Sequence, residues 1–137
     1  MAVKTPRVLY LDASAIVKLV VRETETDALR RFLGSAELVS SEVVTVEVPR
    51  ASYLKTGDPQ TIGHSEQILR RFFLVGLDDG LRRMAARAQP PELRSLDAIH
   101  LVSALQMSSR VEAAVIYDRR LAQAARHGHL IVQSPGT

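Results

Sequence analysis

The sequence predicts an α/β fold with a central, mainly parallel sheet of about five strands. Short apolar segments of strand-like composition alternate with segments whose apolar residues recur at helical spacing. This alternation favours a parallel sheet with helices on both faces. The chain has 137 residues, of which 46% are hydrophobic and 24% charged, as expected for one globular domain. We therefore expect residues 1–137 to form a single domain.

In the first half of the chain, the apolar patterns predict strands at 7–11 and 38–40 and helices at 14–21 and 24–33. The first strand ends abruptly at Asp12, and Gly34 is a typical helix stop. Residues 41–53 fit a helix or a strand. Four valines favour a strand, and Pro49 would remove a hydrogen bond inside a helix.

In the second half, we expect helices at 59–72, 80–88, 95–107 and 119–126 and strands at 73–77, 111–117 and 130–132. Asp78 or Asp79 is the expected cap of the second of these helices. In the helix at 95–107 we expect one broad apolar stripe of Leu96, Ile99, Val102, Ser103 and Leu105.

Two predicted strands are each followed by an aspartate, Asp12 after VLYL and Asp118 after AVIY. In an open parallel sheet, ligands bind at the carboxyl ends of the strands, where the strand order reverses. Asp97 opens a largely apolar helix, and its neighbours suggest that it faces protein. Each acid also has a structural explanation: Asp12 and Asp118 suit turns or caps, and Asp97 suits a helix N-terminus.

Taken together, the three aspartates suggest a metal site. Carboxylates held close together repel one another unless one is protonated or a cation lies among them. Oxygen ligands without cysteine favour Mg²⁺ or Mn²⁺ over zinc. Such an ion activates water and stabilises charge on a phosphodiester under attack, so the predicted chemistry is phosphodiester hydrolysis.

Four segments, YLDASAIVKL, SEVVTVEVPRA, SLDAIHLVSAL and YDRRLA, begin at residues 10, 41, 95 and 117. In order and spacing they resemble the motifs of PIN-domain ribonucleases, specifically the VapC toxins. The resemblance implies a three-layer α/β/α fold in which 41–53 is a helix. It implies catalytic and metal-binding roles for Asp12, Glu47, Asp97 and Asp118, with Ser14 in support. Glu47 is chosen over Glu42 because the Arg50-Ala51 pair of the family pattern follows it.

The resemblance also implies an Mg²⁺- or Mn²⁺-dependent endoribonuclease that leaves a 3′-hydroxyl and a 5′-phosphate. It would act as the toxin of a toxin–antitoxin pair, form a homodimer and be silenced by a VapB-like antitoxin. The chain departs from the family pattern at two places. Pro49 follows Glu47 by two residues, and Ile116 stands where many relatives have threonine.

The amino-acid composition excludes some kinds of site and of covalent bond. The absence of cysteine excludes disulfides, zinc–thiolate sites and cysteine nucleophiles. The formal net charge is +3 and the pI about 9.7, and all but three of the 18 basic residues are arginine. Arginine suits phosphate recognition, although genome composition explains the same bias equally well. We find no signal peptide or membrane span, and expect a cytoplasmic protein with no membrane partner.

Other polar residues have simpler explanations. His100 lies three residues after Asp97, a spacing that suits metal ligands, but a lone histidine on an apolar helix is more often a core residue. Paired arginines usually form a solvated helix face. Arg119 and Arg120 are better candidates for substrate contact because they follow Asp118 at the predicted site.

Two alternative functions remain open at this stage. A phospho-receiver domain is also doubly wound with an acidic rim, but it needs an acidic pair after the first strand and a lysine after the last. This chain has Asp12 alone and ends in VQSPGT. A PIN-like module that has lost catalysis, and that binds only RNA or protein, is the other alternative.

Overall fold

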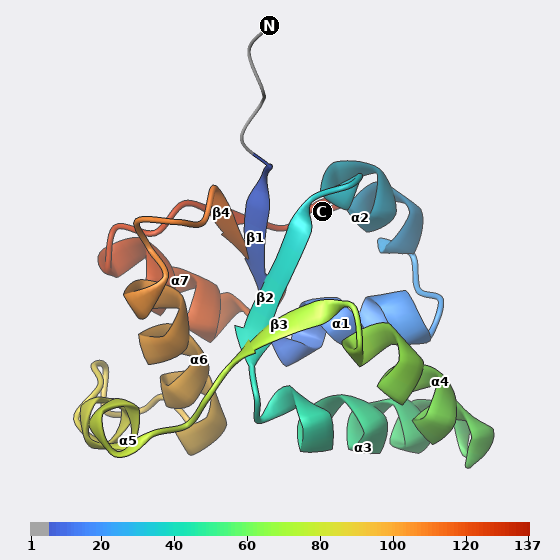
Figure 1. Ribbon diagram of the computed structural model, residues 1–137, viewed down its shortest axis with the longest axis horizontal. Helices are drawn as coiled ribbons and strands as arrows, with labels where there is room; N and C mark the ends of the chain where they lie inside the picture. The colour runs from blue at the N-terminus through green and yellow to red at the C-terminus, as the bar shows by residue number, and fades with distance from the viewer. Residues whose placement is uncertain (1–5) are drawn as a thin grey trace, which may run out of the picture.

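The computed structural model describes residues 6–137, and within them five parallel strands alternate with seven helices (Figure 1). The strands are β1 (Val8–Leu11), β2 (Glu37–Ser41), β3 (Phe72–Val75), β4 (Ala113–Val115) and β5 (Val132–Gln133). The helices are α1 (Ala13–Val20), α2 (Thr26–Leu33), α3 (Val44–Thr56), α4 (Gln60–Leu69), α5 (Asp79–Ala86), α6 (Ser95–Gln106) and α7 (Arg119–His127). The predicted α/β class and parallel sheet are confirmed.

The order of the strands across the sheet is β3-β2-β1-β4-β5, and every neighbouring pair is parallel. The chain moves outward from β1 to β3 and then returns to the other side of β1 with β4. The order therefore reverses between β1 and β4. In sheets of this kind, the carboxyl ends of the two strands at the reversal form the usual ligand-binding crevice.

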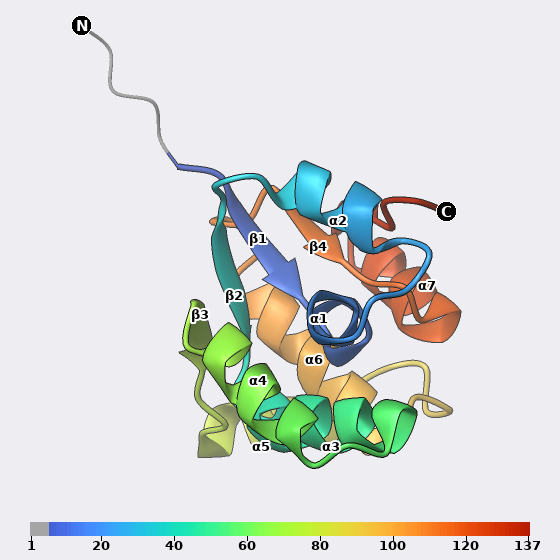
Figure 2. The same cartoon turned by 90° about the vertical axis from the view of Figure 1, so that its right-hand side faces the viewer.

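Alternation along β1 divides the core between the two faces of the sheet. Leu9 and Leu11 lie in one apolar cluster with residues of α1, α2, α3 and α4, whereas Tyr10 lies in a second cluster with residues of α6 and α7. Figures 1 and 2 show these two groups of helices on opposite sides of the strands. Because all three side chains are fully buried, β1 is held firmly at the centre of the molecule.

Local propensity did not decide whether residues 41–53 form a helix or a strand. In the structure, Ser41 is the last residue of β2, and 44–53 belong to α3. Pro49 lies inside α3, and Gly57 ends the helix in the left-handed conformation at φ 67°. Val44 and Val48, one turn apart, are fully buried against α1 and the sheet cluster. Burial on this face outweighs the strand propensity of the valines and the hydrogen bond that Pro49 cannot make.

Two predicted features are wrong in detail. The helix expected at 59–72 ends at Leu69, because Phe72 pairs with Leu38 in β3 and is buried. The stripe expected on the helix at 95–107 is also wrong, since Leu96 is 45% exposed. α6 instead contacts β2, α5 and α7, so small residues such as Ala98 and Ala104 are buried on more than one side.

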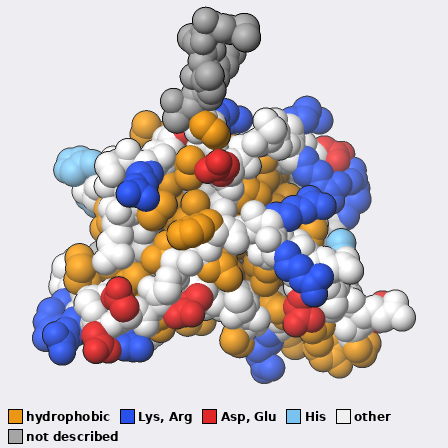
Figure 3. Space-filling view, viewed as in Figure 1, with side chains coloured by type: hydrophobic (Ala, Val, Ile, Leu, Met, Phe, Trp, Pro, Cys, Tyr) orange, Lys and Arg blue, Asp and Glu red, His pale blue; other side chains and the backbone are white. Residues whose placement is uncertain are grey.

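The surface combines charged groups with exposed apolar side chains. Figure 3 shows apolar side chains gathered at the centre of one face, over β2 and β3, and Phe73 of β3 is 68% exposed. Basic and acidic side chains lie together at the lower left of the same view, over α5, and basic side chains gather along its right-hand side. None of the helices in residues 6–137 is long and apolar enough to cross a lipid bilayer.

Candidate active site

Asp12 and Asp118 follow the two strands at which the order of the sheet reverses, and both begin helices. Asp12 is the N-cap of α1, where its Oδ1 accepts a hydrogen bond from the backbone N–H of Ala15 at 3.2 Å. Asp118 is the N-cap of α7, where its Oδ1 accepts from the N–H of Leu121 at 2.9 Å. The capping explanation is therefore correct for both residues, and capping fixes where the two carboxylates lie.

Ser14 joins the ends of these two strands. Its hydroxyl lies 2.7 and 2.8 Å from the two carboxylate oxygens of Asp12, to which it donates. The same oxygen accepts the backbone N–H of Tyr117 at 3.1 Å. Because Tyr117 immediately precedes Asp118, this one side chain ties both acidic segments together. The structure thus gives Ser14 a positioning role between them.

Glu47 is held by a buried histidine of α6. Oε1 of Glu47 lies 2.7 Å from Nε2 of His100, and Nδ1 of His100 lies 2.7 Å from the hydroxyl of Tyr10. Tyr10 and His100 are 0% and 2% exposed, so this Tyr10–His100–Glu47 chain runs from the core of the sheet to the site. It leaves Oε2 of Glu47 without a hydrogen bond among the described residues.

Asp97 and Asp118 line one polar hollow of about 320 Å³, which we call the acidic hollow. Arg94, Arg119 and Arg120 line it too, together with Glu92 and Leu93. Asp97 lies in the first turn of α6 and is half-buried, as its apolar neighbours suggested. Asp12 and Glu47 are not part of this lining: Asp12 is buried, and Glu47 contacts His100.

The charge on these acids is not fully compensated. Burial raises the pKa of Asp12 to about 6, against partial opposition from His100 and the Ser14 hydroxyl. Burial also raises the pKa of Asp97, and the neighbouring charges of Asp118 and Glu47 raise it further. Asp97 therefore lies within electrostatic reach of two of the other three acids.

The donor set fits a hard divalent cation, because it consists of carboxylates that repel one another. The carboxylates are, however, engaged elsewhere: Asp12 with Ser14, Glu47 with His100, and Asp118 with its own helix. Within residues 6–137, no three acidic or histidine side chains form a ready-made metal cage. Binding an ion would therefore require these side chains to turn.

Sequence reasoning named His100 but not its contact with Glu47, and it missed Arg94. His100 is buried, as expected for a core histidine, yet it also contacts Glu47. Its spacing from Asp97 was the available signal, although no pattern in the sequence indicated its second partner, Tyr10. Arg94, which lies immediately before α6, was also missed and lines the acidic hollow with Arg119 and Arg120.

Comparisons with known proteins agree with this arrangement. The family model described as PIN domain matches residues 9–127. Ribonuclease VapC46 of Mycobacterium tuberculosis is 39% identical over 93% of this chain and 97% of its own, and Ribonuclease VapC35 is 38% identical over the same shares. Ribonuclease VapC47 of the same organism is 31% identical, again over 93% and 97%.

A solved structure shows the same fold. The crystal structure of M. tuberculosis VapC20, a toxin that cleaves the sarcin–ricin loop, superposes with a TM-score of 0.68. The superposition covers 85% of this chain and 94% of that one at 15% sequence identity, so it shows only that the two share a fold. The phospho-receiver alternative finds no support in any of these matches. The chain belongs to the PIN domain family, among the VapC ribonucleases.

Proposed function

We propose that this protein is a divalent-metal-dependent endoribonuclease that uses Mg²⁺ or Mn²⁺ and acts as the toxin of a toxin–antitoxin pair. The relatives named ribonuclease VapC, matched over nearly their whole length, support the reaction class. One observation carries the assignment of the site. Asp97 and Asp118 line one hollow, Asp118 follows a strand at which the sheet order reverses, and the charges of Asp118 and Glu47 raise the pKa of Asp97 in addition to the effect of burial.

In this proposal, Asp12, Asp97 and Asp118 hold the cation, with Glu47 as a fourth ligand or as the group that orients the attacking water. A bound divalent cation would activate water and stabilise the charge that builds on the phosphate. The His100 contact at Oε1 leaves Oε2 of Glu47 available to accept a hydrogen bond from that water.

The arginines of the acidic hollow serve the substrate. Arg119 and Arg120 follow Asp118, so their guanidinium groups lie where the RNA backbone would pass. The oxygen of water bonds to phosphorus, the bond from phosphorus to the 3′-oxygen breaks, and that oxygen leaves as a hydroxyl after taking a proton. The products are a 3′-hydroxyl and a 5′-phosphate, and the ribose 2′-oxygen takes no part.

The direct test is cleavage of structured RNA by the purified protein with Mg²⁺ or Mn²⁺. Asp97→Asn keeps the size of the side chain and removes its charge, so it should abolish cleavage. Asp79→Asn on α5 is a control for the same substitution, because Asp79 also lies in the first turn of a helix but is exposed to solvent and does not line the acidic hollow. Undiminished cleavage by Asp97→Asn would overturn the assignment.

The proposed partners are a VapB-like antitoxin and a second copy of the chain. Exposed apolar side chains on α3 support a protein partner: Val46 is 69% exposed and Tyr53, seven residues later on the same face, is 39% exposed. Light scattering coupled to gel filtration distinguishes monomer from dimer. We further propose that residues 1–137 act as one PIN domain in the cytoplasm; Met1 to Thr5 lie outside the described residues.

A further inference from the structure

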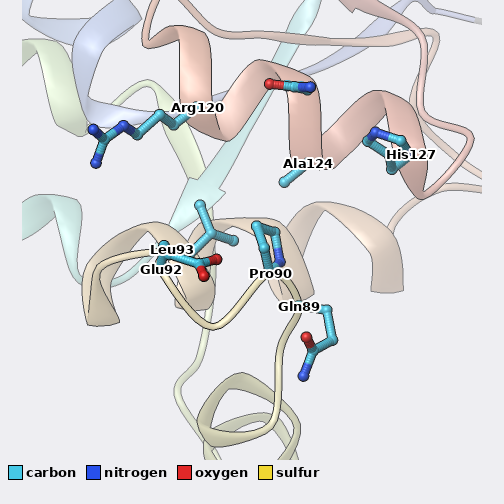
Figure 4. A pocket seen from close by; sticks show the side chains of 8 residues that line it. Gln89, Pro90, Glu92, Leu93, Arg120, Ala124 and His127 are labelled. Atoms are coloured by element: carbon cyan, nitrogen blue, oxygen red, sulfur yellow. The ribbon is translucent and has the colours of Figure 1, made fainter.

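A second hollow lies beside the acidic hollow, and the proposed function does not use it. It lies between α7 and the segment 89–94 and has a volume of about 560 Å³. Figure 4 shows Pro90 and Leu93 on one side of it and Ala124 and His127 on the other. Glu92, Leu93 and Arg120 line both hollows, so the two adjoin one another.

The lining of the second hollow combines apolar walls with a polar rim. Pro90, Leu93 and Ala124 supply apolar surface. Gln89, Gln123 and His127 are exposed and line the same space with amide and imidazole groups. A flat heterocycle matches this combination, since its faces can lie against apolar groups while its edge makes hydrogen bonds.

Arg120 lies at the junction of the two hollows. In Figure 4 its side chain extends from one end of α7, whereas His127 lies at the other end. A guanidinium group here can contact a phosphate in the acidic hollow while its stem lines the second one. The arrangement places a phosphate contact next to an aromatic-sized space, as a nucleotide requires.

We propose that this second hollow is a base pocket that holds a nucleobase of the RNA substrate next to the phosphodiester that is cut. The inference rests on the proposed ribonuclease function and extends it from the cleaved bond to the choice of sequence. A base splayed out of a single strand enters the pocket, and its edge meets Gln89, Gln123 and Glu92.

The acidic side chain of Glu92 makes the pocket selective. An ionised carboxylate only accepts hydrogen bonds, so the base edge that meets it must donate. Uracil presents one N–H flanked by two carbonyl oxygens, which the carboxylate repels. Cytosine, adenine and guanine each carry an exocyclic amino group that donates to it. We therefore expect discrimination against uracil.

An apolar side chain of a protein partner is the competing occupant. It would cover Pro90, Leu93 and Ala124 but would make no hydrogen bonds to the amides of Gln89 and Gln123. A base can pack against the apolar walls and hydrogen-bond to the polar rim, so we assign the pocket to RNA.

The first test measures binding without catalysis. The four nucleoside 5′-monophosphates are titrated into the ¹⁵N-labelled wild-type protein in EDTA, and backbone amide shifts are followed by NMR. Saturable shifts should centre on Gln123, Ala124 and His127, with uridine monophosphate binding weakest. Gln123→Ala should weaken binding several-fold and Ala124→Leu, which fills the pocket, at least tenfold. Gln67→Ala, an exposed glutamine on α4, is the matched control and should bind as the wild type does.

The second test measures sequence choice during cleavage. A short RNA with randomised positions is digested with Mn²⁺, and the cut sites are sequenced. The wild type should show a nucleotide preference at one position beside the cut. Gln123→Ala should flatten it while cleavage continues, and Glu92→Gln should reduce the discrimination against uracil. A preference unchanged in both variants would overturn the proposal.

These outcomes distinguish failure of the proposed ribonuclease function from failure of the base pocket. Loss of all RNA cleavage in the wild type would contradict the proposed function, whereas the EDTA titration would still report on the pocket. Absence of nucleotide binding at Gln123 and His127, with cleavage intact, overturns the base pocket alone. If Gln123→Ala and Ala124→Leu weaken only inhibition by an antitoxin, the pocket belongs to the protein partner and the inference is wrong.

Discussion

Replacing Asp12 by Asn should stabilise the metal-free protein at neutral pH, even though it removes a proposed metal ligand. Asp12 is 3% exposed, and burial raises its pKa from 3.8 to about 6. The folded protein therefore binds a proton more tightly than the unfolded chain does. For such a group, the free energy of unfolding is largest at low pH and falls as the pH rises from about 4 through about 6.

The size of the effect follows from the two pKa values. A shift of one pKa unit corresponds to 1.36 kcal/mol, so the ionised Asp12 costs the folded state about 3 kcal/mol at pH 7.5 and about 1 kcal/mol at pH 4.5. Asn carries no charge to desolvate, and it remains an effective N-cap for α1. The expected gain in stability is therefore about 3 kcal/mol at pH 7.5, and it shrinks toward pH 4.5.

Urea unfolding in EDTA at the two pH values measures this directly. Asp78→Asn is the matched control, because Asp78 caps α5 through the same hydrogen bond, to Leu81 at 2.8 Å, but is exposed to solvent. It should change stability by less than about 0.5 kcal/mol at either pH. A destabilised Asp12→Asn protein at pH 7.5, or a gain that does not depend on pH, would refute the reasoning.

Asp118→Ala, Tyr10→Phe and Ser14→Ala test other parts of the site, and Asp78→Ala is the control for the first of them. Asp118→Ala and Asp78→Ala each remove an N-cap and should each lower the free energy of unfolding by about 1 kcal/mol. Only Asp118→Ala should abolish RNA cleavage, and equal activities of the two variants would contradict the proposed role of Asp118. Tyr10→Phe leaves the buried Nδ1 of His100 without its partner, so the free energy of unfolding measured in urea should fall by about 1–3 kcal/mol. Unchanged stability would argue against the hydrogen bond between Tyr10 and His100. Ser14→Ala removes a hydrogen bond that lowers the pKa of Asp12, so this pKa should be higher in the variant. Carboxyl ¹³C NMR in EDTA measures it, and a lower pKa would be inconsistent with the geometry.

The sheet and the acids at its edge could be predicted because they depend on local patterns. β1 and β4 are short apolar runs, and the aspartate after each belongs to the turn into the next helix. Strand and helix alternation then implies a parallel sheet, in which these ends lie on one edge. No knowledge of distant contacts was needed for that step.

The helix that carries Glu47 could not be predicted from its own residues. Its valines favour a strand, and Pro49 disfavours a helix, whereas burial of Val44 and Val48 against α1 decides the outcome. That burial is a tertiary contact and is not visible in a local pattern. Here, resemblance to a family supplied what propensity could not.

The contacts of His100 were out of reach for a similar reason. Its partners, Tyr10 and Glu47, lie 90 and 53 residues away in the chain. Periodicity on α6 also failed to indicate the buried face, because that helix is covered on several sides and its small residues are buried where larger ones were expected.

A crystal structure of the protein soaked in Mn²⁺, with data collected at the manganese absorption edge, tests the central claim most directly. We predict one or two anomalous peaks among Asp12, Asp97 and Asp118, with the carboxylate of Asp118 or Glu47 turned from its present partner toward the ion. The Asp97→Asn crystal, soaked in the same way, should show no peak there. A peak of full height elsewhere and none among these acids, in crystals that cleave RNA when dissolved, would contradict the account.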